Sequence, residues 1–145
     1  EIPFISVICY EVLFSNFVRD FLNAQETDPQ FIINLTNDSW YGDTAEPHQH
    51  LFLAKWRALE FNIPLIRSTN TGITTIIMPD GAETERLTFE EKKDLDVELR
   101  MHKRTSTYYQ KFGLWMVVLL AGIFYFILSL ERKSFFRQLM NSNKT

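Results

Sequence analysis

The sequence predicts an α/β layered domain over residues 1–111, followed by one transmembrane helix over residues 112–130. Two observations predict this division. In the first part, short apolar runs typical of buried strands alternate with segments of helical periodicity, an order that forms layered α/β domains. In the second part there is no charged residue, whereas nearly all the acidic residues precede it.

The first residues form a predicted strand–turn–helix unit. The apolar run 4–8 indicates a buried strand and ends at Cys9-Tyr10-Glu11. A helical pattern follows, because apolar side chains recur at the spacing of one helix face. These apolar residues are Phe14, Phe17, Val18, Phe21 and Leu22. A buried strand needs neighbours on both sides, so we expect the chain to begin in the middle of a domain of a longer polypeptide.

A second strand and a second helix are predicted next. Residues 31–35 are apolar apart from Asn34 and short enough for a strand, and residues 36–42, polar except for two aromatics, favour a turn. The helix is expected from about Pro47, a residue tolerated at the first helical position, to about Asn62. Its predicted apolar face consists of Leu51, Ala54, Ala58 and Leu59.

Three further strands complete the predicted domain. Residues 64–67 and 72–78 are predicted strands joined by Ser68-Thr69-Asn70-Thr71, and Pro79-Asp80-Gly81 after them indicates a turn. A last, half-exposed strand is predicted where apolar and charged residues alternate. Its apolar members are Leu95, Val97, Leu99 and Met101.

The uncharged stretch 112–130 is close to the roughly 20 residues that cross a hydrocarbon core about 30 Å thick. Trp115 lies near one end, as interfacial aromatic residues do. The alternative is a buried core helix, but such helices rarely stay uncharged on every face. We therefore predict a transmembrane helix. Lys and Arg are equally frequent on its two sides, so the charges do not indicate its orientation.

Composition excludes several classes of function. The net charge of −3 and the lack of a basic stripe argue against a nucleic-acid partner. A single cysteine excludes an internal disulfide and a Cys-rich zinc site. His48 and His50 are two residues apart, a spacing that does not bring them together on a helix, so we favour structural roles for both. We expect neither a metal nor a cofactor.

Cys9 is the candidate nucleophile. It lies where a buried strand meets a predicted helix N-terminus, and free N–H groups there would stabilise a thiolate and hold an oxyanion. The alternative is a packed, inert cysteine. Glu11 either orients a partner of the thiol or only complements the helix dipole. The residues themselves leave both pairs of alternatives open.

Five blocks, in this order, resemble the bacterial apolipoprotein N-acyltransferases, which are membrane members of the nitrilase superfamily. They are Ile8-Cys9-Tyr10-Glu11, Asn37-Asp38-Ser39-Trp40-Tyr41-Gly42, Pro47-His48-Gln49-His50, Arg57-Ala58-Leu59-Glu60 and residues 67–74. The resemblance extends from Ile2 to about Leu130. It implies the C-terminal part of a nitrilase-like α-β-β-α sandwich in residues 1–111. That domain would face the periplasm from the bacterial inner membrane, with residues 131–145 as a cytoplasmic tail.

The resemblance also implies a reaction. An acyl chain would move from a phospholipid donor to the terminal amine of a diacylglyceryl-cysteine lipoprotein acceptor, by ping-pong through a thioester on Cys9. The Tyr10 N–H would contribute to the oxyanion hole, and Glu11 would be a supporting carboxylate. A glutamate base and a lysine would belong to the remainder of the polypeptide, N-terminal to Glu1.

Residues of the 36–42 segment would bind substrate. They are Asn37, Asp38, Trp40 and Tyr41. Tyr41 stands where this family usually has Phe, which adds a hydroxyl and keeps the ring. Two alternatives stay open: a nitrilase-type amidase that hydrolyses small C–N bonds, and a non-catalytic membrane interaction protein.

Overall fold

The computed structural model describes residues 1–89, 91, 93–99 and 104–142. They divide into two compact units, Glu1–Lys111 and Phe112–Thr145. The elements follow one another in the order β1 (Phe4–Ile8), the 3-10 helix η1 (Cys9–Leu13), α1 (Ser15–Asn23), β2 (Phe31–Thr36), α2 (Glu46–Phe61), β3 (Leu65–Thr69), β4 (Thr75–Ile77), α3 (Tyr108–Phe112) and α4 (Trp115–Ser142).

The first unit is built on a sheet with the strand order β1-β2-β3-β4. β1, β2 and β3 are parallel, and β4 is antiparallel to β3. The register places Val7 beside Asn34 and Asn34 beside Arg67. Because the carboxyl ends of parallel strands meet at one edge, the residues that follow β1, β2 and β3 come together there.

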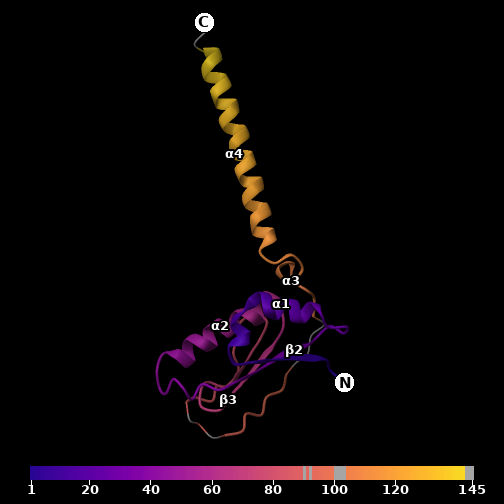
Figure 1. Ribbon diagram of the computed structural model, residues 1–145, viewed down its shortest axis with the longest axis vertical. Helices are drawn as coiled ribbons and strands as arrows, with labels where there is room; N and C mark the ends of the chain where they lie inside the picture. The colour runs from indigo at the N-terminus through magenta and orange to yellow at the C-terminus, as the bar shows by residue number, and fades with distance from the viewer. Residues whose placement is uncertain (90, 92, 100–103, 143–145) are drawn as a thin grey trace. The chain divides into compact units, whose positions relative to one another are not determined.

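Helices α1 and α2 cover one face of this sheet (Figure 1). Alternate strand residues such as Val7, Ile32 and Leu65 point into a core shared with α1 and α2. The other face is apolar but exposed, and on it the rings of Phe4 and Phe31 stack with centroids 5.1 Å apart. The described residues thus form one helix layer and one sheet layer, half of the predicted α-β-β-α sandwich.

Most predicted elements of the first unit are confirmed, with three corrections. Leu59, expected on the buried face of α2, is 37% exposed. The helix expected directly after Cys9 begins only at Ser15, because η1 intervenes and Phe14 is extended. The strand expected from Leu95 is also wrong, since residues 93–99 have no regular structure. Met101 lies outside the described residues.

The strand predicted from Leu95 is absent from the described residues 93–99 because another segment occupies the edge of β4 that does not face β3. Isolated bridges join Thr74 to Leu87 and Ile77 to Glu83. The segment directly after the turn therefore pairs with this edge. An alternating pattern forms a strand only where a neighbouring strand has free hydrogen-bonding groups. For the later segment, β4 no longer offers them.

The second unit contains the long helix α4. Within it, Trp115–Lys133 is long and apolar enough to cross a membrane, and none of this stretch is buried. The helix begins at Trp115 rather than at residue 112, because Gly113 has a left-handed φ of 56° and separates α4 from α3. One such helix does not by itself establish a membrane span, so the transmembrane role of residues 112–130 stays a prediction.

Candidate active site

Cys9 opens η1 at the carboxyl end of β1 and is half-buried. Its φ of 50° is left-handed, a conformation that non-glycine residues rarely adopt. The Glu11 carboxylate closes the turn, because Oε2 accepts a hydrogen bond of 2.7 Å from the Ile8 N–H. Strained turns after a strand are also used in other enzymes to present a nucleophile at the end of a sheet.

In the observed geometry, one predicted cause of thiol activation is missing. The N-terminus of α1 lies at Ser15, beyond η1, and not next to Cys9 as expected. The dipole of a full α-helix therefore does not act at the sulfur, and only the short 3-10 turn does. The assignment of Cys9 as the nucleophile stays a prediction.

A buried arginine lies beneath the cysteine turn. Arg67 on β3 is 0% exposed, and its Nη1 donates to Asn34 Oδ1 at 2.8 Å while Nη2 donates to Asp38 Oδ2 at 2.7 Å. The Asn34 amide in turn donates to the carbonyl oxygens of Val7 and Cys9, both at 3.3 Å. The guanidinium thus connects the ends of β2 and β3 to the backbone of the cysteine.

Asp38 joins this network to Tyr10. Its second oxygen lies 3.1 Å from Nδ1 of the buried His50, whose ring stacks on Tyr10 with centroids 5.0 Å apart. Burial opposes ionisation of Asp38, but the hydrogen bond with His50 and the charge of Arg67 outweigh it and lower the pKa of the carboxyl group. These contacts are consistent with the structural role predicted for His50, which stays a prediction. His48 is exposed.

The predicted substrate loop is held at its base. Asn70, after β3, accepts a hydrogen bond from the Asp38 N–H at 3.2 Å and donates to Asn37 Oδ1 at 2.7 Å. Trp40 is 84% exposed, whereas Tyr41 meets the ring of Tyr10 edge-on at 6.4 Å.

The structure therefore brings Cys9, Tyr10, Asp38 and Tyr41 together and leaves Trp40 in solvent. Asp38 is fully buried, and its carboxylate contacts three side chains, those of Thr36, His50 and Arg67. The substrate contacts predicted for it and for Asn37 stay predictions. Asn34 and Arg67 were not among the site residues predicted from the sequence. A signal was present for Arg67, since it is a charged residue that directly follows the apolar residues Leu65 and Ile66 in β3.

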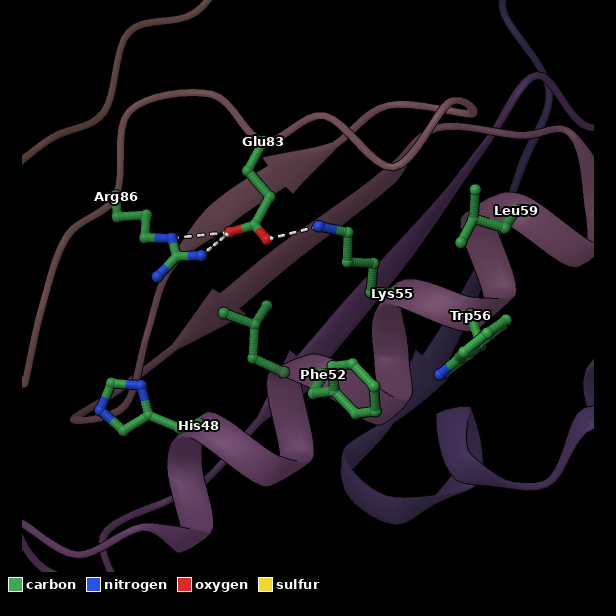
Figure 2. A pocket seen from close by; sticks show the side chains of 8 residues that line it. His48, Phe52, Lys55, Trp56, Leu59, Glu83 and Arg86 are labelled. Atoms are coloured by element: carbon green, nitrogen blue, oxygen red, sulfur yellow. Dashed lines mark hydrogen bonds and ion pairs between the residues drawn. The ribbon is translucent and has the colours of Figure 1, made fainter.

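A separate pocket lies on the outer side of α2 (Figure 2). It has a volume of about 370 Å³ and lies between α2 and residues 83–86. In Figure 2 the Glu83 carboxylate stands between two cations, and it accepts hydrogen bonds from Lys55 at 3.1 Å and Arg86 at 2.6 Å. None of the predicted site residues lines this pocket. It is therefore distinct from the cysteine turn.

These features define a layered α/β domain with a candidate thiol nucleophile at the carboxyl end of a parallel strand. The family model for carbon-nitrogen hydrolases matches residues 4–109, and the chain belongs to this family. Its fold is that of the nitrilase superfamily, as expected.

Several relatives of the chain are named apolipoprotein N-acyltransferase. That of Haemophilus ducreyi is 40% identical over 116 residues, which are 80% of this chain and 22% of the relative. Apolipoprotein N-acyltransferase 2 of Leptospira interrogans is 38% identical over 130 residues, which cover 84% of this chain and 21% of the relative. The apolipoprotein N-acyltransferase of Vibrio parahaemolyticus is 42% identical over 108 residues, which cover 74% of this chain and 21% of the relative. The chain spans about a fifth of the length of these relatives. The resemblance is confirmed.

Among solved structures, a mutant of the Nesterenkonia AN1 amidase from the nitrilase superfamily is similar to this chain. The TM-score is 0.45 and the sequence identity 21%, and the match covers 59% of this chain and 34% of that one.

Gly72 has no room for a side chain, because a Cβ there would lie 2.2 Å from Asp38 Oδ2 and 2.8 Å from Asp38 Cβ. Asp38 cannot move away without breaking its ion pair with Arg67. We expect Gly72→Ala to lower the free energy of unfolding by about 1–3 kcal/mol, measured by thermal unfolding of the detergent-solubilised protein. The control is Gly122→Ala, where nothing lies within 4 Å of the added Cβ. Equal stability of the two variants would contradict the close approach.

Replacing Arg67 tests the ion pair itself. Arg67→Met leaves the Asp38 carboxylate buried without its cation, and we expect a loss of about 3–5 kcal/mol in the free energy of unfolding. The matched control is Lys93→Met, which removes an exposed pair with Glu85 and should cost less than about 1 kcal/mol. Denaturant unfolding of both variants measures the difference. A similarly small loss in both would show that Arg67 does not hold the site together.

Proposed function

We propose that this chain forms part of an apolipoprotein N-acyltransferase in which Cys9 is the nucleophile. The observation that carries the proposal is the strained turn of Cys9 within a chain that matches these enzymes. Cys9 is half-buried at the end of β1; Asn34 donates to its carbonyl oxygen, and Glu11 accepts from the N–H of the preceding Ile8. A thiol nucleophile fixed in this way suits acyl transfer through a covalent intermediate.

The proposed reaction has two halves. The Cys9 thiolate attacks an ester carbonyl of a phospholipid, an oxyanion forms, and a lysophospholipid leaves with a proton, so that an acyl thioester remains on the sulfur. The terminal amine of a diacylglyceryl-cysteine lipoprotein then attacks the thioester, the C–S bond breaks, the nitrogen loses a proton to the proposed base, and an amide and the thiolate result. The Tyr10 N–H is the proposed oxyanion donor. The glutamate base and the lysine implied by the resemblance belong to segments N-terminal to Glu1.

The loop and the long helix suit lipid substrates. Trp40 is exposed beside the site and Tyr41 contacts Tyr10, so both are proposed to line the entry of substrate together with Asn37 and Asp38. The apolar part of α4 is proposed to anchor the domain on the periplasmic face of the inner membrane, with residues 131–145 in the cytoplasm. Both lipid substrates reside at that surface. An amidase acting on small C–N bonds would have no use for such an anchor.

Trapping the intermediate tests the proposed function. Full-length enzyme incubated with phospholipid, without a lipoprotein acceptor, should accumulate a hydroxylamine-labile acyl group on Cys9, detected by mass spectrometry. Cys9→Ser should form no such adduct and lower the transfer rate more than about a thousandfold, because a hydroxyl is far less acidic than a thiol. Folded wild-type enzyme that never forms the adduct would refute the acyltransferase proposal.

Two substitutions of Glu11 separate its geometry from its charge. The Ile8 N–H needs an acceptor at Oε2, which the amide oxygen of Glu11→Gln can replace and Glu11→Ala cannot. If Glu11 acts by closing the turn, Glu11→Gln should keep most of the acyl-loading rate, and Glu11→Ala should lose about tenfold or more, as expected for one charge-assisted hydrogen bond. Rapid-quench measurement of thioester formation gives both rates. An equal loss in the two variants would mean that the charge itself is needed.

A further inference from the structure

The segment 104–111, which leads along the chain towards α4, is fixed to the helix layer. Arg104 is buried, and its Nε donates to the Phe61 carbonyl at 3.2 Å, while its Nη groups contact Asp28 and Gln110. The Gln110 side chain donates to Asn23 Oδ1 at 3.0 Å. Buried polar groups with several partners hold a segment in one place.

Tyr109 begins a chain of hydrogen bonds that leaves this segment. Its ring packs on Phe61 with centroids 5.8 Å apart, and its hydroxyl lies 2.7 Å from Ser15 Oγ. The Ser15 hydroxyl donates a hydrogen bond of 2.7 Å to Glu60 Oε2. Since a serine hydroxyl has one hydrogen, the Tyr109 hydroxyl is the donor to Ser15.

The same series of hydrogen bonds ends at the cysteine turn. Glu60 Oε1 accepts a hydrogen bond of 2.9 Å from Arg57 Nη2, and Arg57 Nη1 donates to the Leu13 carbonyl at 3.3 Å. Leu13 is the last residue of η1, the turn that Cys9 opens. Arg57 is buried, and its Nε has no partner among the described residues. Its guanidinium therefore depends on these two contacts.

We propose that Tyr109 is a positioning residue for Cys9, acting through Ser15, Glu60 and Arg57. This inference rests on the proposed acyl transfer. Loss of the Tyr109 hydroxyl leaves the Ser15–Glu60 pair free to shift, Arg57 follows Glu60, and the end of η1 loses its fixed partner. Reactions that need aligned groups are sensitive to such displacements, since misplacement by about 1 Å can cost a hundredfold in rate.

The test is the rate of acyl loading in full-length Tyr109→Phe. This variant keeps the ring on Phe61 and removes only the hydroxyl. We expect the maximal loading rate to fall about tenfold, with no change in the phospholipid concentration that gives half of it. The matched control, Tyr108→Phe, alters a side chain that is 73% exposed and should load at the wild-type rate.

A double variant tests the route. Contacting residues that act through one chain are non-additive, so Tyr109→Phe combined with Ser15→Ala should load no more slowly than Ser15→Ala alone. Multiplying losses would overturn the proposed route. A loading rate in Tyr109→Phe equal to that of the wild type would overturn the positioning role, even if the variant melts at a lower temperature.

A readout without lipid separates this inference from the proposed function. The rate at which iodoacetamide alkylates Cys9, followed by peptide mass spectrometry, should change at least about threefold in Tyr109→Phe and stay constant in Tyr108→Phe. If the wild type forms no thioester, the acyltransferase proposal fails, and the alkylation rate still decides whether Tyr109 positions the thiol. An unchanged alkylation rate would refute that role.

Discussion

The burial of the Arg67 guanidinium is the constraint on which the rest of the site depends. A charge without access to water is tolerated only where an opposite charge and hydrogen bonds compensate it. Asp38 and Asn34 provide both, and this requirement fixes the loop after β2 against the end of β3. Through Asn34 it also fixes the carbonyl of Cys9. At Gly72 the Asp38 carboxylate already occupies the space that a Cβ would take.

Such a pair is weak evidence for stability, because well-packed apolar residues often stabilise a core as well or better. A more consistent explanation is that it selects one arrangement of the strand ends. The register brings Val7, Asn34 and Arg67 into a single row across three parallel strands. The planar guanidinium of Arg67 binds Asn34 with one nitrogen and Asp38 with another. Because the two nitrogens have a fixed spacing, both contacts form in only one arrangement of the strand ends. The ion pair therefore fixes the position of the cysteine turn relative to the three paired strands.

The sequence was sufficient where a pattern is local. Strands β1 and β2 and helix α2 follow from apolar periodicity, because burial of one face decides them. It failed where a distant partner decides. Leu59 has the right spacing but is 37% exposed, and residues 93–99 form no strand, while Glu83 and Leu87 already pair at the edge of β4. The site divides in the same way. Cys9 is a candidate from its place after a strand, whereas the pairing of Arg67 with Asp38 depends on a fold that brings distant residues together.

The cysteine turn is held from three directions. Asn34 binds the carbonyl at its start, Glu11 closes it from within, and Arg57 binds the carbonyl at its end. A left-handed non-glycine residue persists only where its surroundings over-determine it, and three side-chain contacts on a five-residue turn meet that condition. In the proposed two-step acyl transfer the same sulfur would meet a lipid ester first and an amine later. A turn held in this way would present the proposed thioester to the second substrate in the geometry in which the first one left it.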